Sequence, residues 1–261
     1  KISLSNIEIT AHGDEQTHQV KLDNIAYVLP TKKSPHTLTI ENFIIDSQLN
    51  LTSLTTYTNE PVTIHLEGSL RKTEKQTDLN LAENSLITVN NIVLHKQQGN
   101  VDKSTEATIS TTKNTKNLLS LKALTVKLNG NVQLIEDNAL NINLKVHNQA
   151  SQVNILKKLQ IHSFDLDSQI NGSFDDIRIN TIVQADGIGL GSIVIIGPIS
   201  SPKIEVAANK LQLTDLLSLN IQLPAKVELV DGVLDYNISA KLADLSNIEN
   251  TPFNIAVTVK S

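Results

Sequence analysis

Histidines and paired carboxylates are the residues of this chain most able to carry out acid–base or metal chemistry. Histidines bind a metal when two or more stand at short fixed spacings, such as HxH or HExxH. The seven histidines are scattered without such spacing: His12, His18, His36, His65, His95, His147 and His162. His65 and His147 take polar positions in alternating segments, so we expect surface histidines and no metal site.

Two pairs of acids, Asp165/Asp167 and Asp175/Asp176, could act as general acid and base or bind calcium. Neither pair has the spacing of an EF-hand or a third acid nearby. Asp175 and Asp176 stand between two apolar segments, where aspartate commonly forms a turn. We therefore expect polar surface and turn residues here.

Nucleophile and cofactor motifs are also missing from the sequence. The chain has no cysteine and no GxSxG motif. The segment 187–191 (GIGLG) resembles part of a phosphate loop, but it lacks the Lys-Ser/Thr that would follow, so a hairpin or bulge is expected there. The sequence predicts no catalytic residues, no cofactor and no enzyme.

Composition limits the class of protein further. The chain has 261 residues, of which 39% are hydrophobic, so it could bury a sizeable core. Its net charge of 22 − 27 = −5 argues against a nucleic-acid partner. No apolar run approaches the length of a membrane span. Because the chain starts at Lys1 and has no methionine, we expect a piece of a longer protein.

Apolar and polar residues alternate along most of the chain, which is the pattern of strands with one apolar face. In 140–146 the apolar residues are separated by asparagine and lysine, and Ile2, Leu4, Ile7 and Ile9 alternate with a one-residue slip at Asn6. The pattern predicts an all-β fold in which a long antiparallel sheet forms one continuous segment over 1–261.

Few other elements are expected. Apolar residues at helical spacing predict one or two short helices, at 153–159 and at 213–217, the second capped by Thr214. Polar turns are predicted at 136–138, Asn129-Gly130 and Asp231-Gly232, and a polar hairpin or loop near 97–117. An apolar-x-Gly-x-apolar unit recurs around Gly68, Gly130, Gly172 and Gly232, at irregular spacing that favours a strand–turn–strand array.

One segment resembles a known family. Residues 194–206 (VIIGPISSPKIEV) are similar to the strand–turn–strand signature of the AsmA-like superfamily, which includes TamB and YdbH. The segments 211–219 and 229–234 then resemble the short helix and the glycine-containing strand that follow it. The order of these segments, over about 170–245, is most similar to the YdbH-like branch.

The resemblance implies a fold and a function. It implies a sheet curled into an elongated open groove that moves phospholipids between the inner and outer membranes of the Gram-negative envelope. It also implies a periplasmic location, an inner-membrane anchor outside this chain and a small outer-membrane lipoprotein as partner. The residues expected to line the groove and contact acyl chains are Leu140, Ile142, Leu144, Val146, Ile177, Ile179, Ile204, Val206, Leu234, Tyr236 and Ile238.

A second class of protein fits the same residues. Cysteine-free chains rich in asparagine and threonine are also typical of structural or adhesive surface proteins. Their apolar face forms a closed dry core, and their polar face binds a partner.

Overall fold

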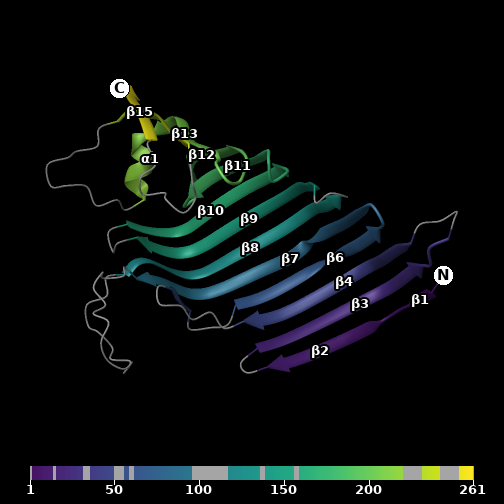
Figure 1. The fold of residues 1–261 in the computed structure, drawn as a ribbon. Coiled ribbons are helices and arrows are strands. Elements are labelled where there is room, and N and C mark those ends of the chain that lie inside the picture. Colours follow the sequence, from purple (N-terminus) through teal and green to yellow (C-terminus); the bar gives the residue numbers. More distant parts are fainter. Residues whose placement is uncertain are drawn as a thin grey trace, which may run out of the picture.

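Among the described residues of the computed structural model, fifteen strands form one sheet in which every paired strand is antiparallel to its neighbour (Figure 1). The structure describes residues 2–13, 16–31, 36–49, 56–58, 62–95, 117–135, 139–155, 159–219, 231–241 and 253–260. The order across the sheet is β1-β3-β4-β6-β7-β8-β9-β10-β11-β12-β13-β14-β15, and β2 and β5 pair with β3 and β7. The all-β prediction is confirmed.

The N-terminal strands are β1 (Ile2–Leu4), β2 (Ile7–Gly13), β3 (Gln16–Val28), β4 (Thr37–Leu49), β5 (Thr56–Thr58), β6 (Val62–Thr73) and β7 (Gln76–His95). The central strands are β8 (Asn117–Ile135), β9 (Ala139–Ile155), β10 (Leu159–Gly172) and β11 (Ile177–Ala185). The C-terminal elements are β12 (Ile188–Gly197), β13 (Lys203–Gln212), α1 (Leu213–Ser218), β14 (Val233–Lys241) and β15 (Phe253–Lys260).

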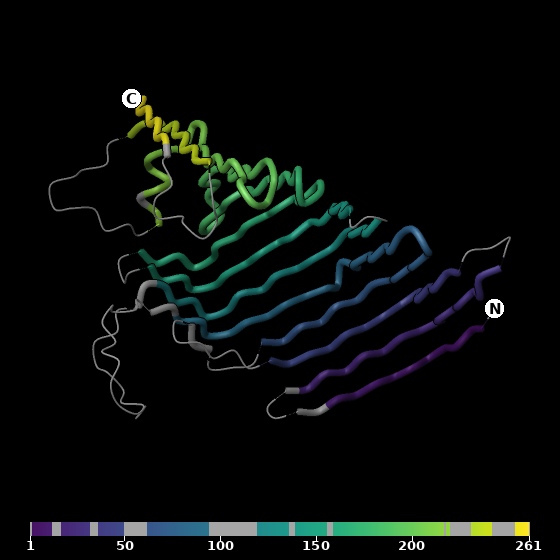
Figure 2. The backbone as a smooth tube through the Cα atoms, in the orientation of Figure 1, coloured from purple at the N-terminus to yellow at the C-terminus, as the bar shows by residue number. Residues whose placement is uncertain are grey.

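The sheet is open rather than closed into a barrel. Its strand order starts at β1 and ends at β15, and these two strands do not pair with each other. The tube in Figure 2 follows the same course, curling most strongly toward the C-terminal strands. The chain exposes 17883 Å² of surface, against roughly 11,000 Å² expected for a compact protein of its mass. The expected open curled sheet is therefore present.

Helix is scarce in the described part of the chain. Its one helix, α1, is six residues long, so no helix in these ranges could cross a membrane. The helix predicted at 213–217 is confirmed, but its predicted cap is wrong. Gln212 occupies the N-cap position and makes no side-chain capping hydrogen bond.

Residues with a left-handed backbone conformation keep the apolar side chains of a strand on one face where the alternation of apolar and polar residues is interrupted. Asn6 and Asn24 have φ of 56° and 51°. The slip predicted at Asn6 falls between β1 and β2, which both pair with β3. In β3, Leu22 and Ile25 are three residues apart and still share a face, because Asn24 shifts the phase between them. Asparagine tolerates this conformation better than most residues do.

A similar phase shift explains why the predicted helix at 153–159 is wrong. Val153 to Ile155 belong to β9 and Leu159 begins β10, with 156–158 outside the described residues. Gln152 has φ of 49°, so Ala150 and Val153 enter the same buried cluster although three residues separate them. The spacing of three arises from a left-handed residue in a strand and imitates a helical period.

The predicted turn at Asn129-Gly130 is also wrong, because both residues lie inside β8. Gly130 has φ of 131°, and a Cβ atom there would lie 2.2 Å from the carbonyl oxygen of Asn143 in β9. Glycine is needed for this close approach of two strands, and not for a reversal of the chain.

Other turns form as expected. Asp186 and Gly187, with φ of 50° and 80°, form a two-residue hairpin between β11 and β12, as predicted for 187–191. Asp176 lies in the turn after β10, where its backbone N–H donates a hydrogen bond to Ser173 Oγ at 3.3 Å. Asp231 and Gly232 lie directly before β14, but residues 220–230 before them lie outside the described residues, so the turn predicted at Asp231-Gly232 stays a prediction. The predicted turn at 136–138 and most of the predicted loop, 97–116, lie outside the described residues, and Asn117 begins β8.

Candidate functional site: the apolar face

The most extended feature of the sheet is a row of apolar residues that crosses it from strand to strand. Residues directly opposite each other in antiparallel strands share a face, so the register follows the row through twelve strands. It consists of Ile7, Leu22, Phe43, Gly68, Leu81, Gly130, Leu144, Ile170, Ile179, Ile195, Ile204 and Ala240. No polar side chain interrupts it. We call the side of the sheet that carries this row the apolar face.

A second row runs beside the first. It consists of Leu4, Ile25, Ile40, Leu70, Leu79, Val132, Ile142, Gly172, Ile177 and Gly197. Because Ile142 and Leu144 are two residues apart in β9, both rows lie on the apolar face.

All eleven residues predicted to line a groove lie on this face. Ile142 and Ile177 belong to the second row, and Leu144, Ile179 and Ile204 belong to the first. Leu140 and Val146 in β9 and Val206 in β13 lie two residues from members of the rows. In β14, three residues follow Ala240 of the first row at two-residue steps: Ile238, Tyr236 and Leu234. Ile177 is buried and the other ten are half-buried. The structure thus places them together, and their predicted contact with lipid stays a prediction.

The sequence analysis did not select the N-terminal part of the face. Leu22, Phe43 and Leu81 continue the first row through β3, β4 and β7. Only the register between strands aligns these residues with β9, because their places in the row depend on pairings across β6 and β8.

Helix α1 covers one end of the apolar face. Leu219 directly after it is 3% exposed and packs in a cluster with Ala150, Val153, Ile161 and Ala185. Leu216 of α1 packs against the same cluster. This end is a small closed core, whereas most of the described residues along the two rows remain only partly covered.

Two polar contacts on the apolar face join neighbouring parts of the sheet. Ser168 and Thr181 lie opposite each other on β10 and β11, and their hydroxyls are 2.9 Å apart. Tyr236 donates a hydrogen bond of 2.8 Å to the carbonyl oxygen of Leu190, and burial raises the pKa of its phenol. Tyr236 therefore also connects β14 to β12. Such pairing satisfies polar groups that would otherwise be costly inside an apolar surface.

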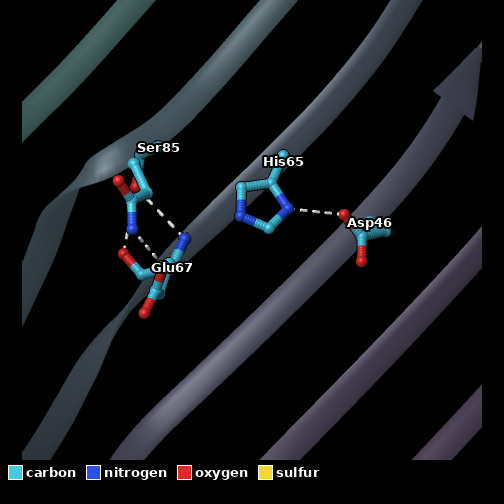
Figure 3. A network of polar contacts seen from close by, with 5 residues as sticks. Asp46, His65, Glu67 and Ser85 are labelled. Atoms are coloured by element: carbon cyan, nitrogen blue, oxygen red, sulfur yellow. Dashed lines mark hydrogen bonds and ion pairs between the residues drawn. The ribbon is translucent and has the colours of Figure 1, made fainter.

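The opposite side of the sheet is polar, and we call it the polar face. His65 lies opposite Asp46, and His147 lies opposite Asp167, each with 2.6 Å between Nδ1 and Oδ1. The predicted surface histidines at 65 and 147 therefore lie on the polar face and pair with carboxylates. Figure 3 shows His65 turned toward Asp46, and the contact of Ser85 with Glu67 nearby.

Asparagines form a row on the polar face. Asn80, Asn131, Asn143 and Asn171 lie on adjacent strands from β7 to β10. Asn131 Nδ2 donates to Asn80 Oδ1 at 2.7 Å, and Gln169 Nε2 donates to Asn143 Oδ1 at 2.9 Å. These cross-strand contacts give the polar face its own stabilising pairs.

A hollow of about 590 Å³ also lies on the polar side, over β7 to β11. Its lining includes Lys127, Lys145, His147, Asp167 and Ile182. Of the eleven residues predicted to line a groove, Val146 alone borders this hollow. The hollow therefore lies apart from ten of the eleven predicted acyl-chain contacts.

The described residues contain no group of three or more histidine or acidic side chains arranged for a metal ion. Comparison of the chain with protein-family models, with curated proteins and with solved structures gives no match. The function is therefore inferred from the apolar and polar side chains on the two faces of the sheet.

Asp235 ties the last two strands to β13, and its titration gives a testable dependence on pH. Lys260 Nζ and the backbone N–H of Lys210 each donate to its carboxylate at 2.7 Å, and they hold the pKa of Asp235 below its ordinary value. A lowered folded-state pKa adds stability above the ordinary aspartate pKa, near 4. That contribution is lost as the pH falls through the lowered value.

We expect the protection of β15 amides against hydrogen exchange to decrease below about pH 4. Asp235→Asn should lower this protection already at neutral pH and should remove its dependence on acid. Protection factors compared across pH by mass spectrometry measure both effects. An identical acid response in the variant would show that Asp235 is not responsible.

Proposed function

We propose that the protein binds phospholipid acyl chains on its apolar face and conducts them between inner and outer membranes without covalent chemistry. The observation that carries the proposal is the apolar row through twelve strands, which α1 covers only at one end. The proposal places the protein in the periplasm as an AsmA-like protein. Its proposed partners are an inner-membrane anchor outside this chain and a small outer-membrane lipoprotein.

Binding on the apolar face would be favourable because it removes an acyl chain from water. Each CH₂ group costs about 0.8 kcal/mol in water, so a chain of roughly sixteen carbons costs about 13 kcal/mol. Contact with a continuous aliphatic surface lowers that cost along the whole path, while the headgroup stays in water.

The length of the row suits movement by sliding. Adjacent strands are about 4.8 Å apart, so twelve strands extend over about 53 Å. One bilayer leaflet holds chains about 15 Å long, half of a hydrocarbon core of about 30 Å. Several chain lengths therefore fit along the row. Nine of its twelve residues have aliphatic side chains, which favours similar affinity at successive positions over one deep site.

The segment that carries the family resemblance supports the proposal through its local structure. β12 ends at Gly197, a turn follows, and β13 begins at Lys203. α1 and β14 then follow in the order expected from the resemblance.

A structural or adhesive role is the second candidate, and the hollow on the polar face favours it, because such a protein would bind its partner on that side. Extraction of the purified protein with organic solvent separates the two candidates. Phospholipid detected by mass spectrometry supports the transport proposal, and a lipid-free protein supports the structural role.

Photo-crosslinking tests which face contacts lipid. Crosslinkers at Ile142 or Ile179 should capture phospholipid, because both positions lie on the apolar face. Crosslinkers at the neighbouring Asn141 or Arg178 should not, because these exposed residues lie on the polar face. Mass spectrometry of the adducts provides the measurement. Equal labelling at both kinds of position would refute the proposal.

A further inference from the structure

Two adjoining hollows on the polar face are rich in carboxamide side chains. The hollow of about 590 Å³ over β7 to β11 shares Glu83, Asn129 and Lys145 with a second hollow of about 450 Å³ over β7 to β9. The five strands from β7 to β11, which lie side by side in Figure 1, extend over about 19 Å. We call the two hollows together the amide groove. Its carboxamide residues are Asn80, Asn129, Asn131, Asn143, Gln169 and Asn180.

Several of these carboxamides have hydrogen-bonding capacity that the fold does not use. A carboxamide can donate two hydrogen bonds and accept two. Asn131 donates to Asn80 at 2.7 Å, but the side chains of Asn129 and Asn180 make no hydrogen bond to any described residue. Donors and acceptors are therefore available side by side in the groove, where a ligand with matching groups can replace water.

The charged side chains in the amide groove balance each other. Lys127 and Lys145 are matched by Glu83 and Asp167. Neither lysine makes an ion pair with a described residue, whereas Asp167 pairs with His147. An anionic ligand would meet two carboxylates, and a cationic ligand would meet two ammonium groups. The groove therefore favours an uncharged ligand over both.

We propose that the amide groove binds an uncharged oligosaccharide. Sugar hydroxyls both donate and accept hydrogen bonds, so they match carboxamides, which also do both. Ile182 in β11 is 56% exposed and offers an apolar surface to the C–H face of a sugar ring. An extended peptide fits less well, because it pairs with free backbone groups at a sheet edge, and β8 to β10 are paired on both sides. This binding goes beyond acyl-chain binding on the opposite face and does not depend on it.

Immobilised oligosaccharides test the proposal. The neutral probes are cellotetraose, maltotetraose and chitotetraose, and tetragalacturonate is the acidic probe. At least one neutral probe should retain the protein, and retention should not weaken as the salt concentration rises, because salt screens only interactions between charges. Calorimetry with the same probe in solution then gives the Kd. Failure of all three neutral probes to bind, or a preference for the acidic probe, overturns the proposal.

Substitutions then locate the binding site. The double variant Asn129→Ala/Asn180→Ala should raise the Kd about tenfold, because it removes two carboxamides that bond to the ligand. Neither substitution removes a hydrogen bond to a described residue, so the urea midpoint should stay unchanged.

Asn237→Ala is the matched control, because Asn237 is an exposed residue of β14 on the polar face that lines neither hollow. The Kd of this variant should equal that of the unmodified protein. An unchanged Kd in a folded double variant overturns the proposal, and so does an equal loss of binding in the control. Extraction of phospholipid reports on the opposite face, so its result is distinguishable from both.

Discussion

Ile179→Asp should reduce phospholipid binding by roughly one hundredfold. Ile179 is the ninth of the twelve residues in the first apolar row and lies opposite Ile170 and Ile195. An acyl chain that crosses this position would strip water from the new carboxylate, at a cost of about 3 kcal/mol. Lipid transfer between donor and acceptor vesicles should fall to a similar degree. Quantified co-purified lipid and the transfer rate measure the effect.

The matched control lies one residue away on the other side of the same strand. Arg178→Asp introduces the same side chain at an exposed position of the polar face, so lipid binding should stay unchanged. Circular dichroism and the urea midpoint separate lost binding from lost folding. Equal losses in both variants, or full binding by Ile179→Asp in a folded sheet, would contradict a lipid-contacting apolar face.

Gly130→Ala should destabilise the sheet by about 3 kcal/mol or more. The new Cβ atom would lie 2.2 Å from the carbonyl oxygen of Asn143 and 2.9 Å from Cα of Leu144. The backbone φ of 131° is also unfavourable for any side chain. Because β8 and β9 are long central strands, their separation should affect the whole sheet. The midpoint of urea unfolding, followed by circular dichroism, measures the loss.

Gly189→Ala in β12 is the control for this substitution. No atom lies within 4 Å of a Cβ built at Gly189, and its φ is outside the left-handed region. The same chemical change should therefore alter the free energy of unfolding by less than about 0.5 kcal/mol. Similar destabilisation by both variants would mean that contact with β9 is not the cause.

The alternation of residues was sufficient to predict strands and their apolar sides. In 140–146 the apolar residues lie on one face and the asparagines and Lys145 on the other. The slip at Asn6 was also visible, because one extra polar residue separates Leu4 from Ile7. The short helix near 213–217 was recognisable, although its capping residue was not.

The errors arose where one local pattern has two structural causes. Apolar residues three positions apart at Ala150 and Val153 look helical, but a left-handed Gln152 within a strand gives the same spacing. Asn129-Gly130 looks like a hairpin turn, but the glycine permits close contact with β9. The partner strand distinguishes these cases, and it lies outside the local sequence window.

The sequence by itself determined which side of each strand is apolar, because successive side chains of a strand point to opposite faces. Only the tertiary structure decided that these sides align into rows through twelve strands, since register depends on pairings between distant residues. It also decided that α1 covers one end of the face, where Leu219 packs in a buried cluster. Coverage depends on which elements meet in space, a property that no single strand encodes.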